Sequence, residues 1–302
     1  MKKVIVVAGA TGNLGLRIVK ALLANHAVVI ALVRNTSDVV KLNNLEKLGA
    51  KVVKVNLNNV DEISKACVGA SCVISALAGL RETIINTQKI LLDAAVKAGV
   101  PRFIPSDFSL DFRDLVYGSN RNLDLRREFH QYLNQANIKS TSIFNGPFTD
   151  LLTNQMPMIF FKFHKVLYWG NPQQKMDFTT MDDTAAFTAK VAMDESSPRY
   201  LKIAGDQLNV KEIATIMTQL TGKKYGLIKA GGVGFLNMMI KIGKTFAPAE
   251  NDLYPAWQGM QYMRDMIEGR VDVSNHDNNR YPEIKWASIK DVLLAHLNST
   301  KL

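Results

Sequence analysis

The stretch Val6-Val7-Ala8-Gly9-Ala10-Thr11-Gly12-Asn13-Leu14-Gly15 decides the fold of this chain. It joins a short apolar run to a segment with helical periodicity, so it indicates a strand, a glycine turn and a helix. Such a turn directs the free N–H groups of a helix start toward an anion, and the helix dipole adds positive potential there. Gly9 permits the tight turn, Gly12 lets the backbone approach a pyrophosphate, and Gly15 lets helix and strand pack closely. We therefore expect this turn to bind a dinucleotide.

Strands and helices alternate through the first half of the chain. The predicted strands cover residues 3–8, 27–33, 51–55, 71–75, 102–104 and 140–144. Helical patterns occupy 82–97 and 123–135, and Asn59 with Glu62 forms a capping box that opens a shorter helix. Six strands joined through helices by short connections predict an α/β fold with a Rossmann-type, doubly wound parallel sheet.

The residue at the end of the second predicted strand distinguishes NAD from NADP. An acidic residue there would bind the ribose 2′-hydroxyl group, whereas an arginine accommodates a 2′-phosphate. The chain has Arg34 at this point, and Lys41 follows one helical turn later. The planar guanidinium group donates two hydrogen bonds to a phosphate. The sequence therefore predicts NADP(H) as the cofactor, and the alternative interpretation of Arg34 is an ordinary surface arginine.

The pattern becomes less regular beyond Pro147. We expect an apolar helix over 148–161, a hairpin over 165–179 and a strand over 200–204. Further helices are predicted over 180–193, 209–222, 235–242, 257–267 and 289–297. The predicted organisation is an NADP-binding Rossmann domain over 1–150, with returning elements within about 175–222. A smaller, mostly helical substrate-binding region is expected over 151–302.

Composition excludes several classes of protein. The chain is 47% hydrophobic and 21% charged, as is ordinary for a soluble globular protein. No apolar run approaches the roughly 18 to 20 residues that span a bilayer. The apolar run at the start is too short for a signal peptide, so we expect a cytoplasmic protein. Cys67 and Cys72 lack metal-ligand spacing, so no metal site is predicted and both are expected to be buried thiols.

The net charge of +10 fits a solvated surface together with a polyanionic cofactor. Lys and Arg are spread along the chain without an arginine-rich arm, which disfavours nucleic acid as a partner. The predicted partner is a small-molecule substrate, no membrane partner is expected, and a homo-oligomer is compatible with the sequence.

The later strand ends should line the same crevice, because ligands of open α/β sheets bind outside the carboxyl ends of the strands. The candidates at these ends are Asn56, Ala76, Leu77, Ala78, Ser106, Asn145, Pro147 and Phe148. They join Arg34 and the residues of the glycine turn, Gly9, Thr11, Gly12, Asn13, Leu14 and Gly15, as predicted cofactor contacts. Ser106 and Asp107 could orient substrate or nicotinamide, and the alternative is that they only cap a turn.

The chain resembles the NmrA-like family of atypical short-chain dehydrogenases, which includes the isoflavone and phenylcoumaran reductases. The resemblance is carried by the glycine turn, by Leu32-Val33-Arg34, by residues 102–108 (RFIPSDF) and by residues 182–188 (DDTAAFT). It covers most of residues 1–222. The resemblance implies an NADP-binding protein, commonly a reductase of small aromatic, enone or quinone-like compounds. Some members of the family are non-catalytic NADP sensors that report redox state to a protein partner.

The resemblance also draws attention to the start of the helix after the fifth strand. Plant reductases of the family carry a lysine there, which positions the nicotinamide ribose and supports proton transfer. Arg126 takes its place in this chain. Arginine could hold a ribose or polarise a carbonyl, but it cannot donate a proton near neutral pH. The Tyr-x-x-x-Lys pair of ordinary dehydrogenases is absent, and its nearest approach is Tyr117 followed by Arg121.

The predicted catalytic residues are Arg126 and Tyr117. Water and His130 are the other candidate acids, although a histidine in this setting is more often a surface or capping residue. Aromatic and methionine residues of 156–169 and 257–263 could line an apolar pocket, but core packing is the favoured interpretation.

The predicted function is an NADP(H)-dependent oxidoreductase that reduces a small apolar carbonyl, enone or quinone-like substrate by hydride transfer. A quinone-type acceptor can take its proton from solvent, so it tolerates a missing protein acid. The alternative is a non-catalytic NADP(H)-binding redox sensor of NmrA type.

Overall fold

The computed structural model describes residues 2–153 and 155–300, and its N-terminal part is a parallel β-sheet covered on both faces. The strand order is β3-β2-β1-β4-β5-β6. Every pair of neighbours in this sheet is parallel. The strands are β1 (Val4–Ala8), β2 (Val28–Arg34), β3 (Lys51–Val55), β4 (Cys72–Ser75), β5 (Arg102–Ile104) and β6 (Lys139–Ser140). This topology confirms the predicted doubly wound sheet, and its strand order reverses between β1 and β4.

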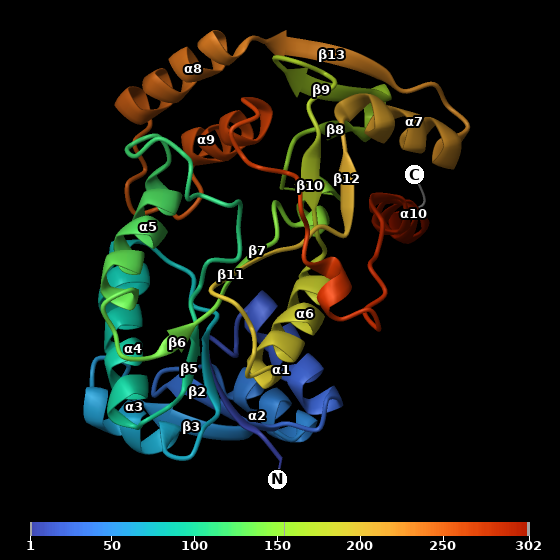
Figure 1. Cartoon of the computed structure of the whole chain (residues 1–302). Helices are drawn as coiled ribbons and strands as arrows, with labels where there is room; N and C mark the ends of the chain where they lie inside the picture. Colours follow the sequence, from blue (N-terminus) through green and yellow to red (C-terminus); the bar gives the residue numbers. More distant parts are fainter. Residues whose placement is uncertain (1, 154, 301–302) are drawn as a thin grey trace.

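Helices form a layer on each face of the sheet (Figure 1). One layer contains α1 (Asn13–Ala24), α2 (Val39–Leu48) and α6 (Met181–Met193), and the other contains α3 (Val60–Cys67), α4 (Gln88–Lys97) and α5 (Arg121–Leu133). A π-helical turn, Glu82–Thr87, leads into α4.

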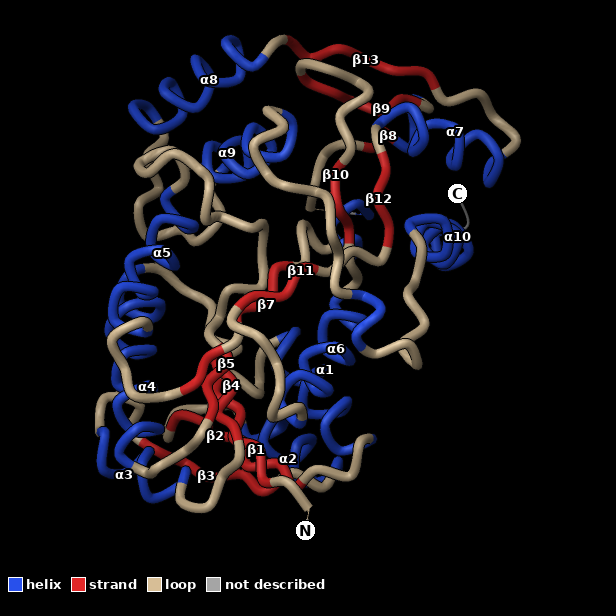
Figure 2. The backbone as a smooth tube through the Cα atoms, viewed as in Figure 1, coloured by secondary structure: helices blue, strands red, loops and turns tan. Residues whose placement is uncertain are grey.

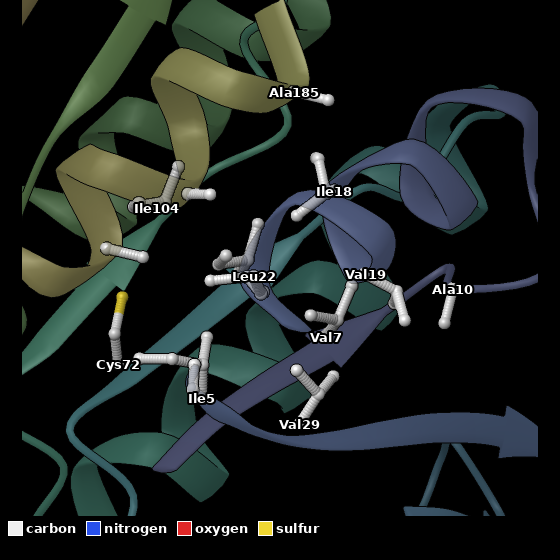
Figure 3. Packing of buried hydrophobic residues seen from close by; sticks show 14 of the residues in the cluster. Ile5, Val7, Ala10, Ile18, Val19, Leu22, Val29, Cys72, Ile104 and Ala185 are labelled. Carbon is white, nitrogen blue, oxygen red and sulfur yellow. The ribbon is translucent and has the colours of Figure 1, made fainter. Parts of the chain in front are cut away.

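Strand β1 shows how one short sequence serves both layers. Successive residues of a strand point to opposite faces, so Ile5 and Val7 reach one core while Val6 and Ala8 reach the other. Figure 3 shows Ile5 and Val7 beside α1, whose buried side includes Leu22. Full burial on both faces explains why this strand is a continuous apolar run.

The predicted sixth strand, residues 140–144, is divided in two in the structure. β6 pairs with β5, and β7 (Ser142–Phe144) pairs in parallel with β11 (Tyr200–Lys202). The chain therefore leaves the main sheet at the break between β6 and β7. Two later elements come back to the N-terminal part: β11 pairs with β7, and α6 packs on α1.

Two predictions for the region after Pro147 are wrong. The expected helix over 148–161 is instead a 3₁₀ turn, Thr149–Thr153, followed by β8 (Ile159–Phe160); Asn154 lies outside the described residues. Pro157 lacks the N–H group that a continuous helix needs.

The expected hairpin over 165–179 is also absent, because its two strands find other partners. β9 (Lys165–Trp169) pairs with β8 and with β13 (Gly226–Gly231), and β10 (Met176–Phe178) pairs with β12 (Asp206–Leu208). Figure 2 shows these short strands at the end of the molecule away from the main sheet.

The predicted later helices are present. They are α7 (Val210–Thr221), α8 (Val233–Phe246), α9 (Ala256–Ile267) and α10 (Ile289–Thr300). α7 begins with the full capping box of Asn209 and Glu212, and it ends at Gly222, whose backbone adopts the left-handed helical conformation. Across residues 2–153 and 155–300, every helix is too short or too polar to cross a bilayer.

Candidate functional site

The turn between β1 and α1 requires glycine at two positions. Gly9 has φ of 83°, and a Cβ atom there would lie 2.5 Å from the carbonyl oxygen of Ala76. A Cβ atom on Gly15 would lie 2.1 Å from the carbonyl oxygen of Gly9. Both contacts are with backbone, which cannot rotate away as a side chain can. Glycine at these positions therefore sets how closely α1 approaches the sheet.

The first turn of α1 is built to leave amide groups free. Gly12 is the N-cap residue, no side chain caps the helix, and its first turn contains no acidic residue. A Cβ atom on Gly12 would lie 3.2 Å from the Gly9 carbonyl oxygen, which is tight but tolerable. Asn13 receives a hydrogen bond from Arg17 at 2.9 Å, and Leu14 packs against the core. The helix dipole is therefore uncompensated at the edge where ligands bind in this topology.

Arg34 is exposed at the last position of β2. The nearest acidic residue along the chain, Asp38, is already engaged, because its carboxylate accepts hydrogen bonds from the Val40 and Lys41 amides at 2.8 and 3.1 Å. Within residues 2–153 and 155–300, no ion pair involves Arg34. The guanidinium group is thus available to an external anion.

The loops after β3 and β4 extend the same edge of the sheet. Asn56 is exposed, and its side-chain oxygen accepts the Asn58 amide at 3.0 Å. After β4, Ala78 is exposed, Ala76 is half-buried and Leu77 is buried. Small residues here leave the backbone accessible beside the glycine turn.

Ser106, at the end of β5, connects three segments of the site. Its hydroxyl donates to the Leu77 carbonyl at 2.5 Å, and its amide donates to Oε1 of Gln88 at 2.9 Å. Its carbonyl accepts a hydrogen bond at 3.0 Å from Nε of Arg126. The Ser106 hydroxyl donates within the protein, which agrees with the alternative of a turn residue, and its contact with the cofactor stays a prediction.

The residues after β7 also act mainly through their backbone. Asn145 is fully buried, and its carbonyl accepts the Thr179 hydroxyl at 2.7 Å. The Pro147 carbonyl accepts the Thr179 amide at 3.2 Å, and Phe148 packs against the core that includes α1. These contacts fix the segment that follows β7 at the C-terminal edge of the sheet.

Arg126 projects from α5 and is only 9% exposed. Besides the Ser106 carbonyl, it contacts the Asn122 carbonyl through Nη1 at 2.8 Å. Two backbone acceptors therefore hold the guanidinium group in one orientation. Tyr117, the other predicted catalytic residue, is 65% exposed in the loop before α5, so the two do not form a buried pair.

His130 lies one turn after Arg126 and is buried, so the expectation of a surface or capping residue is wrong. Its Nε2 atom is 2.6 Å from Oδ2 of Asp107, which is fully buried. Burial opposes ionisation of Asp107, but the charge and hydrogen bond of His130 hold the pKa of this carboxyl below its usual value. Ser142 lies 3.4 Å from the same nitrogen and receives a hydrogen bond at 2.7 Å from Arg199. This network fixes α5 to the ends of β5 and β7.

Tyr262 of α9 is the residue of the site that sequence reasoning missed as a functional group. Burial raises the pKa of its phenol, whereas the positive charge of Arg126 acts in the opposite direction. The phenol is therefore protonated at neutral pH and lies near the Arg126 guanidinium. It is 136 positions from Arg126 in the sequence, so no local motif could have paired them.

A small hollow adjoins the segment after β7. It is lined by apolar residues, Leu110, Phe144, Pro147, Met176, Met266 and Val271, together with the charged residues Asp111, Lys175, Asp177, Lys202 and Asp272. The expectation of core packing holds for Met158, which is buried, and for Tyr168 and Trp169, which pack against the same hydrophobic cluster. It is wrong for Phe163, which is 72% exposed.

Comparison with known proteins places this site in a family. The model of the NmrA-like family matches residues 1–252. Pinoresinol reductase 1 of Arabidopsis thaliana is 26% identical over 96% of this chain and 95% of its own length.

Two solved structures share the fold over nearly the whole chain. The structure of AtPrR2 with NADP+ and (+)pinoresinol has a TM-score of 0.83 and 24% identity, covering 98% of this chain and 99% of that one. The binary complex of leucoanthocyanidin reductase with NADPH from Vitis vinifera has a TM-score of 0.80 and 20% identity, with 98% and 99% coverage. The predicted cofactor, NADP(H), is the one bound in both. With most of its length matched, and with the fold expected from its motifs, the chain belongs to the NmrA-like family.

Proposed function

We propose that the protein is an NADPH-dependent reductase of a small apolar carbonyl, enone or quinone-like substrate. The observation that carries the proposal is the pairing of an uncapped α1 start with an unpaired, exposed arginine at the end of β2. The start of α1 would bind the pyrophosphate of a dinucleotide, and Arg34 would select the dinucleotide that carries a 2′-phosphate.

The residues present fit this cofactor. The glycine turn packs tightly, since a Cβ atom on Gly9 or Gly15 would collide with neighbouring backbone, and this brings the start of α1 close to the end of β1. The amides of the first α1 turn would bind the pyrophosphate, and Arg34 would bind the 2′-phosphate through its planar fork. Ala76 and Ala78 would face the ribose and phosphate through their backbone. When bound, NADPH supplies the hydride for the reduction.

The protein's own contribution to the reaction centres on Arg126 and Tyr262. Arg126 is held by two backbone carbonyls and carries a permanent charge, so it would polarise the acceptor oxygen of the substrate. Tyr262 is protonated at neutral pH, so its hydroxyl would donate the proton that this oxygen needs after reduction. Tyr117 remains the second candidate acid, and it would have to move from its exposed position to reach Arg126.

The family supports the coarser part of this proposal. The relatives named above are reductases of plant phenolic compounds, and the two solved structures contain NADP+ or NADPH.

The proposal is tested by mixing purified protein with NADPH and a panel of quinones, enones and lignans, and following loss of the reduced nicotinamide absorbance. We expect turnover of at least one apolar acceptor, with NADPH preferred over NADH. Tight NADPH binding without turnover of any acceptor would contradict the reductase.

A second function, an NADP(H) redox sensor, is favoured by one specific observation. Two donors of Arg126 are already committed to backbone carbonyls, and the family resemblance implies that Arg126 replaces a proton-transferring lysine of the plant reductases. The sensor predicts different affinities for NADP+ and NADPH together with no turnover. Equal affinities for the two forms would remove the argument for it.

A further inference from the structure

Helix α8 presents a row of large apolar side chains to solvent, which we call the α8 face. It consists of Phe235, Met238, Ile242 and Phe246, whose exposed fractions are 47, 47, 49 and 82%. At about 100° of rotation per residue, these four positions fall within an arc of about 80° around the helix. A contiguous exposed row of this kind marks an interaction surface, whereas single exposed apolar residues do not.

The α8 face is not an unfilled part of the core. The other side of the same helix is already packed, with Leu236 fully buried and Ile240 nearly so. Gly243 lies against Trp257 of α9, so closely that a Cβ atom would come within 3.0 Å of the tryptophan Cβ. Figure 1 shows α8 on the outside of α9, at the end of the molecule opposite the main sheet. One side of α8 is therefore packed against the protein, and the α8 face on the opposite side is exposed to solvent.

The segment that carries the α8 face has charge of a single sign, and the next acidic residue along the chain is Glu250. The segment 223–246 contains five lysines and no acidic residue: Lys223, Lys224, Lys229, Lys241 and Lys244. Lys229 and Lys241 are exposed, and Lys244 lies over the Trp257 ring. Ile228, which precedes Lys229 on β13, is also exposed, at 41%. The partner of this surface must accept apolar side chains and attract cations.

We propose that the α8 face docks on the surface of an anionic lipid bilayer. A helix with an aromatic and aliphatic row flanked by lysines fits the boundary between headgroups and acyl chains. The apolar row would enter this boundary, and the lysines would meet anionic headgroups, each strengthening binding by about fivefold near the surface. Docking of this kind leaves the protein on one side of the bilayer and needs no spanning helix.

Charge disfavours the simplest competing occupant, a second copy of this chain. A two-fold interface places the same patch on both subunits, so the lysines of one α8 face would approach the lysines of the other. An anionic bilayer reverses the sign of that interaction, and it accepts an apolar row without needing a complementary groove.

The test is cosedimentation of the full-length protein with vesicles of phosphatidylcholine alone or mixed with phosphatidylserine. We expect binding to the mixed vesicles only, and loss of most binding when the salt concentration is raised. Phe246→Ser and Ile242→Ser should each weaken binding by about tenfold, from the apolar area withdrawn. Lys241→Gln should weaken it by about fivefold. Matched controls are Val40→Ser and Lys47→Gln, which change exposed residues of α2.

Three outcomes would overturn the proposal. One is equal binding to neutral and anionic vesicles, and another is no loss in the α8 variants relative to the α2 controls. The third is a wild-type dimer in solution that Ile242→Ser converts to a monomer without any vesicle binding, which would show that a second copy covers the face. Because the α8 variants lie away from the glycine turn, their NADPH affinity should stay unchanged, and circular dichroism checks that they fold.

Discussion

The glycine turn permits a prediction in which two neighbouring alanine substitutions have opposite consequences. In Gly15→Ala the new methyl group would lie 2.1 Å from the Gly9 carbonyl oxygen, well over 1 Å closer than an ordinary contact. α1 must then move away from β1, which opens the packing of Ile18 and Leu22 against the sheet. Overpacking of this kind costs about 3 kcal/mol, or roughly 5 °C in Tm for a chain of this length.

Gly12→Ala should behave differently because its methyl group meets the same oxygen at 3.2 Å. The neighbour needs to move only a few tenths of an ångström, and the change of N-cap residue costs about 1 kcal/mol. The methyl group nevertheless occupies the side of the turn that the pyrophosphate would approach. Losing one or two charge-assisted hydrogen bonds weakens NADPH binding by about 10- to 100-fold.

The assay combines thermal unfolding without cofactor and titration of each variant with NADPH by calorimetry. We expect Gly15→Ala to lose both stability and affinity, and Gly12→Ala to lose mainly affinity. Gly259→Ala is the control, since a Cβ atom on this α9 residue has no neighbour within 4 Å. Unchanged affinity in Gly12→Ala, or unchanged Tm in Gly15→Ala, would refute the roles given to these two glycines.

Three other substitutions test separate parts of the site. Arg34→Asp should weaken NADPH binding about 100-fold and change NADH binding much less, and equal losses in titrations with both would show that Arg34 does not contact the 2′-phosphate. Tyr262→Phe should lower kcat for an enone by about 100-fold without changing the Kd for NADPH, and an unchanged kcat would exclude its phenol as the acid. Asp107→Asn should cost about 2 kcal/mol of stability at pH 7 in urea unfolding, from the lost interaction with His130. The pKa of Asp107 in the folded protein is held below 3.8, its ordinary value. The stabilising contribution of Asp107 is therefore complete above pH 3.8 and is lost as the pH falls through the folded-state pKa. The difference in unfolding free energy between wild type and Asp107→Asn should narrow over that pH range.

The Rossmann half of the fold could be predicted because its signals are local. The glycine turn lies between an apolar strand and an amphipathic helix, and each later strand is a short apolar run before a helix. The second half resisted prediction because β9 and β10 pair with strands distant in sequence, β13 and β12. A run such as 148–161 has apolar residues at helical spacing, but Pro157 interrupts it, and the structure has a turn and a strand there.

The same distinction applies to the site. The glycine turn and Arg34 follow from position in a strand–turn–helix unit, and Arg126 follows from its place after β5. The burial of His130 against Asp107 depends on how α5 packs on the sheet, and the approach of Tyr262 depends on α9 packing. No sequence motif links the two residues of either pair, so neither contact could be predicted without the three-dimensional structure.

The preference for one dinucleotide over the other is the property on which the proposed function depends most directly. Calorimetric titration of the wild-type protein with NADPH and with NADH measures it without any assumption about substrate. We expect NADPH to bind about 100-fold more tightly, because only its 2′-phosphate can engage the exposed Arg34 guanidinium. Equal affinity for the two cofactors, or tighter binding of NADH, would contradict the assignment of Arg34 and of NADP(H).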